Sequence, residues 1–320
     1  MDEFLEIRHQ LEKANEQFSF IDMVLVRPSL YWIPFIKQRR DTLLKSNEAT
    51  IEFAKRQIEK REEDIQNGSY QMDENCEPKD FLDAYLLERN RRKKQDGDVG
   101  HYTKKQLIFT IIDLWQAGME TTIITLTWGF LYLLKTPTEK MREELRQVVG
   151  EDRDVELQDR QLLPYCNAAI NEVHRLTSLL TTNEVHRLTS LLTTNVLRRN
   201  IWDTTIDGYP VPAGTENAVV MSALFKDAEI FPEPRRFEPE RYLGSDGKAI
   251  EQKVIPFGIG KRACLGEGLA RAEIFLILLN IVKNYRIIED GDIPEAWEKG
   301  KMTAFVKLPV NYECIFEKVK

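Results

Sequence analysis

Long apolar runs, histidines and closely spaced cysteines are scarce in this chain of 320 residues. No run of 18 or more apolar residues occurs, so we expect no membrane-spanning helix. The most apolar stretches, 121–134 and 274–282, predict buried helices instead. Because Met1 is followed by Asp2, Glu3 and a charged helical pattern, we also expect no signal peptide.

The cysteines and histidines exclude several kinds of site. The four cysteines show no CxxC spacing, which argues against a disulfide framework and a zinc site; they are Cys76, Cys166, Cys264 and Cys314. Of the four histidines, His174 and His186 lie in a duplicated segment, so the sequence does not favour a histidine metal site. The net charge of −7 argues against a nucleic-acid-binding protein, which usually has a basic surface.

Helical patterns fill the first 195 residues, and short strands follow. We expect helices at 2–17, 41–66, 79–92, 102–135 and 139–150, with Pro28 and Pro34 interrupting the chain between the first two. The segment 159–175 is expected to form a short turn and another helix. The helix at 102–135 lacks a polar face, which predicts burial through the middle of the domain. Short strands are expected at 196–199, 204–209 and 215–220, then a proline-rich meander at 230–243, a helix at 264–284 and a hairpin region at 285–320. The fold class is therefore mainly α with small β-sheets.

The loop at 256–266, PFGIGKRACLG, carries the clearest chemical pattern. Gly258 and the glycine two residues later allow a tight turn with positive φ. Cys264 then begins an apolar helix, whose N-terminus stabilises a thiolate. Gly266 leaves room for a flat ligand, and Arg262 is able to pair with a carboxylate through its forked guanidinium.

This loop matches the cytochrome P450 pattern Phe-x-x-Gly-x-Arg-x-Cys-x-Gly at every fixed position, so the chain resembles that family. The resemblance implies a haem b cofactor (iron protoporphyrin IX) with Cys264 as the axial iron ligand. It also implies that Arg262 holds a haem propionate and that Phe257 shields the sulfur, with Gly258 and Gly266 beside the cofactor. Thiolate ligation pushes electron density onto iron and favours cleavage of the O–O bond.

The long helix contains a second family segment, AGMETT at 117–122. In cytochrome P450s this segment lies over the haem, where the helix opens to leave a groove for dioxygen. A glycine beside threonines is a known cause of such a local distortion. The resemblance implies that Ala117 and Gly118 line the cofactor, and that Glu120 and Thr121 relay protons.

Further family segments follow in the expected order. Glu172 and Arg175 form a Glu-x-x-Arg pair on one helix face, and the resemblance implies that Arg241 of the meander joins them. Arg198 lies where microsomal members have a second residue that binds a propionate. The wider text, including LPYCNAAINE and IFPEPRRFEPERYL, resembles the animal microsomal branch over essentially the whole chain.

A tandem duplication complicates this assignment, because residues 171–182 (NEVHRLTSLLTT) recur unchanged as 183–194. The second copy supplies an alternative pair, Glu184 and Arg187. The spacing from the preceding helix favours the first copy, whereas the spacing to Arg198 favours the second. We expect the first copy to be native-like, since it continues the apolar helix, and the second copy to loop out near the substrate pocket.

Family members also carry segments that do not precede Met1, among them a membrane anchor and a β-rich domain. We therefore expect 1–320 to be a single partial domain, the C-terminal two-thirds of the fold, truncated at the N-terminus. Its expected parts are a mostly helical region (1–195), short strands and meander (196–263), the helix after the cysteine loop (264–284) and a C-terminal hairpin region (285–320). An error of gene prediction or a decayed gene would explain both the truncation and the duplication.

The resemblance implies a monooxygenase that inserts one oxygen atom of O2 into a small lipophilic substrate. Its electrons would come from a donor of the NADPH-cytochrome P450 reductase type. The implied location is the endoplasmic reticulum membrane, with a cytoplasmic location left open because the chain shows no anchor. The alternatives are a non-catalytic or haem-deficient fragment, a P450 that rearranges peroxides, and a helical interaction protein without cofactor. Glu120 and Thr121 argue against peroxide rearrangement, which needs no proton relay.

Overall fold

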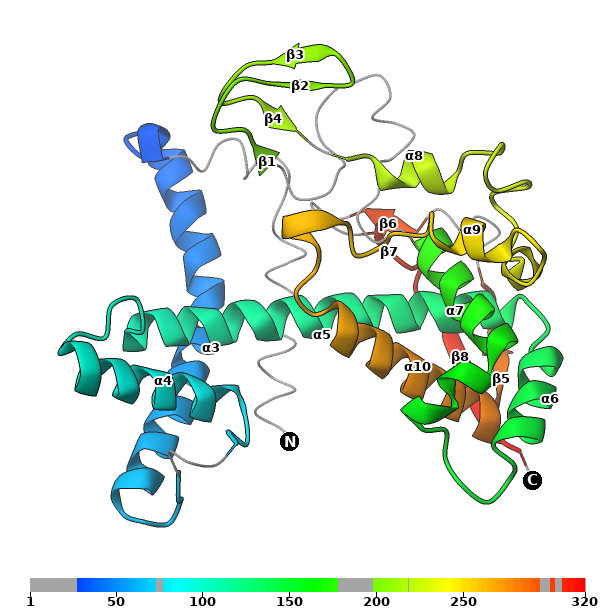
Figure 1. The fold of residues 1–320 in the computed structure, drawn as a ribbon, viewed down its shortest axis with the longest axis horizontal. Helices are drawn as coiled ribbons and strands as arrows, with labels where there is room; N and C mark the ends of the chain where they lie inside the picture. The colour runs from blue at the N-terminus through cyan, green and yellow to red at the C-terminus, as the bar shows by residue number, and fades with distance from the viewer. Residues whose placement is uncertain are drawn as a thin grey trace. The chain divides into compact units, whose positions relative to one another are not determined.

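The computed structural model describes residues 28–72, 77–177, 198–217, 219–293, 300–302 and 307–319. Helices dominate these residues and short strands gather late in the chain, which confirms the predicted fold class (Figure 1). The α-helices are α3 (Pro34–Gln66), α4 (Phe81–Asp96), α5 (Lys104–Leu134), α6 (Glu139–Val148), α7 (Pro164–Thr177), α8 (Met221–Phe225), α9 (Gly247–Glu251) and α10 (Glu267–Asn284). The strands are β1 (Arg198–Arg199), β2 (Thr204–Ile206), β3 (Tyr209–Val211), β4 (Glu216–Asn217), β5 (Tyr285–Asp290), β6 (Lys301–Met302), β7 (Lys307–Leu308) and β8 (Glu313–Lys318). The helix expected at 2–17 lies outside the described residues.

Two helix starts illustrate how local chemistry sets the elements. α3 begins at Pro34, so the prediction that this proline interrupts the chain before a helix at 41 was wrong. Proline suits the first helical position, because the N–H that it lacks would have no partner there. α4 begins after Asp80, whose side chain accepts a hydrogen bond from the N–H of Asp83 at 2.9 Å. It ends at Gly97, which has a φ of 70°.

The described residues group into two compact units, one up to Met119 and one from Glu120 onward. In the first unit, α3, α4 and the start of α5 share an apolar core. Its buried members are Ala54, Ile58, Tyr85, Leu86, Leu107, Ile108 and Ile112. Arg61 of α3 bonds the carboxylate of Asp80 at 2.8 Å, so an ion pair joins the helices at the edge of this core.

The second unit packs the end of α5 with α6, α7 and α10 around a larger core. Buried members of this core include Leu126, Leu133, Met141, Leu145, Leu163, Ile274, Phe275, Leu278 and Leu279. Trp128 of α5 is fully buried and donates its indole N–H to the carbonyl of Lys307 at 2.9 Å. One turn further on, Tyr132 stacks on Phe237, with ring centroids 5.7 Å apart. The meander residue Phe237 is thereby held against α5.

Burial along α5 differs from the prediction. Residues toward its C-terminus, such as Ile124 and Leu131, are buried, but Leu114, Ala117 and Gly118 are exposed. The prediction that this helix is buried through the middle of the domain was therefore wrong for these exposed residues, because the two ends of α5 pack into separate cores. By length and composition α5 is also able to cross a membrane, with a mean hydropathy of 1.3 over 18 residues. The prediction of no membrane-spanning helix considered only uninterrupted apolar runs, whereas a mean hydropathy over 18 residues allows a few polar residues among the apolar ones.

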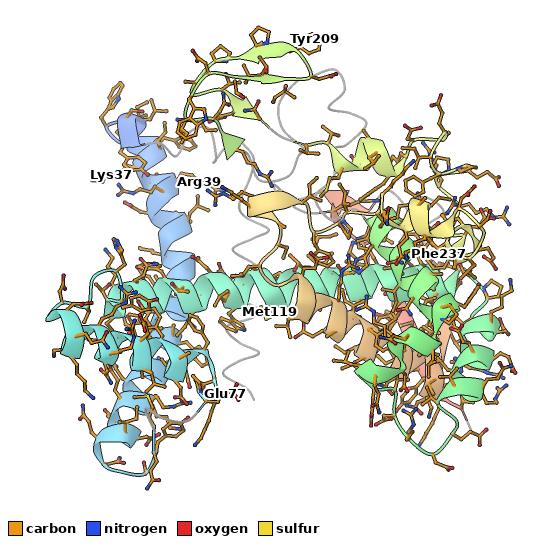
Figure 2. All side chains as sticks on the ribbon, in the orientation of Figure 1. Lys37, Arg39, Glu77, Met119, Tyr209 and Phe237 are labelled. Carbon is orange, nitrogen blue, oxygen red and sulfur yellow. The ribbon has the colours of Figure 1, made fainter. Side chains whose placement is uncertain are left out.

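The described strands form antiparallel pairs: β1 with β4, β2 with β3, β5 with β8, and β6 with β7. The β2–β3 hairpin turns at Asp207 and Gly208, which both have positive φ. The prediction of one strand over 204–209 was therefore wrong, because the Asp-Gly turn ends β2 at Ile206. Tyr209 follows this turn, and its side chain is exposed (Figure 2). The pairing of β5 with β8, from Tyr285↔Lys318 to Asp290↔Glu313, accords with the expected C-terminal hairpin region.

Candidate cofactor site

The cysteine loop closes on itself through one backbone hydrogen bond. The N–H of Cys264 donates to the carbonyl of Phe257 at 2.9 Å. Between them, Gly258 and Gly260 have φ values of 73° and 76°, which confirms the predicted positive φ at both glycines. α10 begins only at Glu267, so Cys264 lies three residues before the helix rather than at its first residue.

The thiol of Cys264 lies on an open, mostly apolar surface. Among the described cysteines Cys264 is exposed, Cys166 is buried and Cys314 is intermediate. Leu265, which follows it in the loop, and Leu269 of α10 are 90% and 65% exposed. A Cβ added at Gly266 would meet no atom within 4 Å. Two apolar side chains and Cys264 are therefore uncovered together at this loop.

Two of the predicted cofactor-binding arginines meet at this loop. Arg198 belongs to β1 and is paired with Asn217 of β4. Its guanidinium Nη2 donates to the backbone carbonyl of Arg262 at 3.4 Å. Both side chains are exposed, so two guanidinium cations lie close to the cysteine loop and remain open to an anionic group.

Phe257 is the aromatic anchor of the loop. The ring of His174, from α7, packs against it edge to face, with centroids 5.4 Å apart and planes 69° apart. The guanidinium of Arg271, from α10, lies 4.8 Å from its ring centroid. The sequence predicted Phe257 but neither neighbour, because the contacts join segments distant in the chain.

Glu172 is the centre of a buried polar network on α7. Its carboxylate accepts hydrogen bonds from Arg175 at 2.7 and 2.8 Å, and from the Nε of Arg241 at 3.1 Å. Tyr242 also donates its hydroxyl to Glu172 at 2.8 Å, and burial together with this carboxylate raises the pKa of Tyr242. Arg175 further donates to the backbone carbonyls of Phe225, Pro234 and Arg236. The network thus ties α7 to the meander.

The sequence placed Glu172, Arg175 and Arg241 in this network but missed Tyr242, although it directly follows Arg241. The backbone carbonyls that accept from Arg175 could not be predicted, because every residue has a carbonyl and no sequence pattern marks which one is used. The alternative residues Glu184 and Arg187 lie outside the described residues. The preference for the first copy of the duplicated segment therefore stays a prediction.

The Ala-Gly-Met-Glu-Thr-Thr segment lies on α5, with Ala117 and Gly118 at the end of the first unit and Glu120 and Thr121 at the start of the second. The helix is continuous through this segment, so the expected opening does not interrupt it. Thr125 donates its hydroxyl to the carbonyl of Thr121 at 2.8 Å, a bond that a continuous helix accommodates. The placement of these residues over a cofactor stays a prediction.

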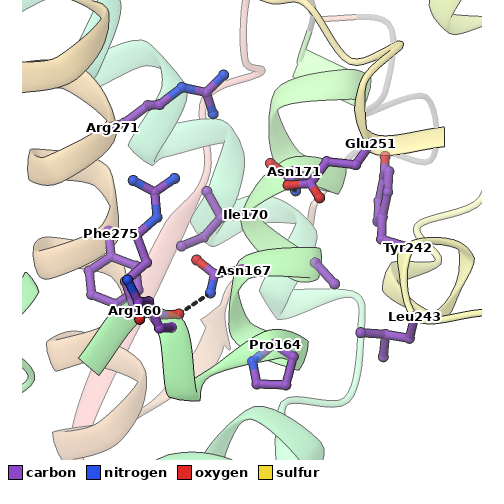
Figure 3. A pocket seen from close by; sticks show the side chains of 12 residues that line it. Arg160, Pro164, Asn167, Ile170, Asn171, Tyr242, Leu243, Glu251, Arg271 and Phe275 are labelled. Atoms are coloured by element: carbon purple, nitrogen blue, oxygen red, sulfur yellow. Dashed lines mark hydrogen bonds between the residues drawn. The ribbon is translucent and has the colours of Figure 1, made fainter. Parts of the chain in front are cut away.

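A separate pocket of about 370 Å³ lies between α7, α10 and the meander (Figure 3). Arg160 and Arg271 lie on one side of it, with Tyr242 and Glu251 on the other (Figure 3). On the floor, the side chain of Asn167 donates to the carbonyl of Arg160 at 2.6 Å. The sequence did not predict this pocket, and none of the residues predicted to bind the cofactor lines it.

These features define a class of protein. The chain is mainly helical, and its exposed cysteine stands in a glycine-containing loop before a core helix, beside two arginines and open apolar surface. Such a loop suits a flat cofactor that carries a soft metal and anionic groups. Comparison with known proteins specifies the class: the cytochrome P450 family model matches residues 1–316, and the chain belongs to this family.

Individual relatives agree with this assignment. The chain is 32% identical to cytochrome P450 2C3 of Oryctolagus cuniculus over 306 residues, which cover 93% of this chain and 56% of that protein. It is 32% identical to cytochrome P450 2H1 of Gallus gallus over 316 residues, or 98% and 60% of the two chains. It is 38% identical to the probable cytochrome P450 CYP36A1 of Caenorhabditis elegans over 219 residues, or 67% and 42%. The chain thus spans about half the length of the curated relatives it matches.

Membership of this family implies a haem held through a cysteine thiolate, and the residues around Cys264 fit such a group. The exposed sulfur is a soft ligand suited to iron. Open space beside Gly266 and the exposed leucines accommodate a flat apolar face. The guanidinium groups of Arg198 and Arg262 suit its carboxylates.

Proposed function

We propose that this protein is a haem-thiolate monooxygenase that inserts one oxygen atom from O2 into a small lipophilic substrate. The observation that carries the proposal is the exposed Cys264, closed onto Phe257 by a backbone hydrogen bond and placed just before α10. When bound, the haem supplies the redox chemistry that activates dioxygen.

In this proposal each loop residue has a separate task. Cys264 holds the iron, while Arg198 and Arg262 hold the propionates through charge-assisted hydrogen bonds. Phe257 covers the sulfur and limits the access of water to it, which favours a stable metal–sulfur bond. Gly258 gives the loop its turn, and Gly266 presents no side chain to the flat group.

The residues of α5 perform the proton chemistry in this proposal. The carboxylate of Glu120 and the hydroxyl of Thr121 accept protons from solvent and pass them toward the reaction site. Ala117 and Gly118 are small and exposed, so they leave room on the helix for dioxygen and substrate. Adjacent acid and hydroxyl groups on one helix turn make such a relay short.

The electron donor in this proposal is an NADPH-cytochrome P450 reductase-type partner, and the location is the endoplasmic reticulum membrane. Support for both comes from the similarity to the vertebrate relatives above. The exposed side chain of Leu114, close to the small residues Ala117 and Gly118 on α5, favours a lipophilic substrate.

The absorption spectrum of the reduced, carbon monoxide-bound chain tests the proposal. We expect the full chain, supplied with haem, to show a Soret band at the position of a thiolate-bound iron. We expect Cys264→Ser to lose this band, because an alcohol does not provide a thiolate. The matched control is Cys314→Ser, since Cys314 lies in β8 away from the loop, and it should keep the wild-type band.

Two outcomes would overturn the proposal. If the wild-type chain takes up no haem, the alternative of a haem-deficient P450-like fragment replaces it. If Cys264→Ser and Cys314→Ser give the same spectrum as the wild type, haem binds elsewhere and the assigned ligand is wrong. Product formation from a lipophilic test substrate with reductase and NADPH then separates an active enzyme from a non-catalytic haem protein.

A further inference from the structure

His174 contacts the cysteine loop at one residue, the aromatic ring of Phe257. It lies on α7 between Glu172 and Arg175, but its own ring packs edge to face on Phe257 at 5.4 Å. Arg271 of α10, shown in Figure 3 on the wall of the pocket, places its guanidinium 4.8 Å from the same ring. Phe257 is therefore held by side chains from two different core helices.

The ring of His174 is buried and uncharged. Only 4% of the residue is exposed, and its Nε2 has no hydrogen-bond partner among the described residues. Burial, together with the nearby charges of Arg271 and Arg160, lowers the pKa of His174 to about 3. The imidazole therefore stays neutral, and its Nε2 forms no hydrogen bond with the described residues. What the ring does at this position is to pack against Phe257.

Phe257 transmits this contact to Cys264. Its backbone carbonyl accepts the N–H of Cys264, and the glycines at 258 and 260 give the intervening chain little conformational restraint. The residues 259–262 are exposed, so their side chains contribute little packing. The position of the Cys264 backbone therefore depends strongly on where the Phe257 ring is held.

We propose that His174 is a positioning residue for the Cys264 thiolate, acting through Phe257 and the hydrogen bond that closes the loop. This inference rests on the proposed function of Cys264 as the iron ligand. His174 itself touches neither the sulfur nor the cofactor. Its aromatic ring, rather than its ability to gain a proton, is the property that matters.

Amide hydrogen exchange of the haem-free full chain tests the inference without any cofactor. We expect His174→Leu to accelerate exchange of the Cys264 amide about tenfold, as the loss of one aromatic pair predicts. His174→Phe keeps an aromatic edge and should remain within about twofold of the wild type. His186→Leu alters the same residue in the second copy of the duplicated segment and should change nothing. Amides of α6 report whether global stability has changed.

The haem-loaded chain provides a second measurement. We expect His174→Leu to reduce the fraction of the carbon monoxide complex that has the thiolate band, and His174→Phe to restore it. If His174→Leu folds poorly, His174→Gln gives the same comparison, because it is polar and of similar size but lacks a ring.

The inference is overturned if exchange at Cys264 is equal in His174→Leu and His186→Leu. It is also overturned if His174→Phe behaves like His174→Leu, because the ring would then not be the required feature. A wild-type chain that binds no haem contradicts the proposed function alone, since the exchange measurement is made without haem. The failure of one proposal is therefore distinguishable from the failure of the other.

Discussion

At the scale of single residues, the Glu172 carboxylate has the most demanding environment in the described chain. It is fully buried and lies against the charged groups of Arg175 and Arg241. A buried ion pair needs nearly complete hydrogen bonding to offset its desolvation. This network provides it through Tyr242 and through backbone carbonyls of α8 and the meander. Removal of its negative charge leaves the buried guanidinium of Arg175 without its carboxylate partner, while Arg241 keeps only its longer pair with Glu238 at 3.4 Å.

We therefore expect Glu172→Gln to lower the free energy of unfolding by about 3–5 kcal/mol, the usual cost of breaking a buried pair. Chemical denaturation of the purified chain measures this value. The duplicated segment supplies a matched control, Glu184→Gln, in which the neighbouring sequence is identical. We expect this control to stay within about 0.5 kcal/mol of the wild type. Equal losses in the two variants would show that the first copy does not occupy α7 alone.

His174 gives a pH dependence whose sign follows from its low pKa. The unfolded chain binds a proton on this residue near pH 6.5, whereas the folded chain resists protonation until about pH 3. The unfolded state thus binds more protons between these values, and stability is lost as the pH falls through that window.

For this one residue, we expect a loss of about 2 kcal/mol in the free energy of unfolding between pH 7.5 and pH 5. His174→Phe should lose correspondingly less over the same interval, because phenylalanine does not titrate. Denaturant titrations at the two pH values measure both changes. Carboxylates contribute equally in the two proteins and cancel in the difference, so an identical pH dependence in both would contradict the buried, neutral histidine.

At the scale of elements, α7 decides how the duplicated sequence is used. The residues that precede the first copy on α7 include Cys166, Ala168, Ala169 and Ile170, and all four are buried. With the second copy in the place of the first, Leu180 would replace Ala168 in a position packed against Met221 and Phe225. A leucine there would overfill the core, which favours the first copy.

Deletion of residues 183–194 is informative because removal of either copy yields the same polypeptide. It shortens the connection between α7 and β1 from 20 residues to 8. For a flexible connection, the loop-closure entropy predicts a gain of about 0.8 kcal/mol. Thermal unfolding of the deleted and full chains measures the difference. A large loss of stability would mean that the second copy contributes packing of its own.

At the scale of the whole molecule, periodicity and turn chemistry predicted the elements well but their burial less well. The long helix at 102–135 follows from local sequence, and the structure has it, whereas the strand expected at 204–209 is divided by a turn into a hairpin. The division into two units was not predicted, because it depends on which helices share a core. The exposure of the middle of α5 was not predicted for the same reason. Hydropathy indicates that a residue favours burial, but it does not indicate whether another element packs against it.

For the candidate site, the sequence by itself determined the cysteine loop, its glycine turn and the Glu-x-x-Arg pair, since each depends on spacing within a short segment. Only the tertiary structure decided that His174 and Arg271 hold Phe257, that Tyr242 joins Glu172, and that Arg198 meets Arg262. The physical reason is that these contacts join residues distant in the chain, and packing and backbone carbonyls select them rather than any local pattern.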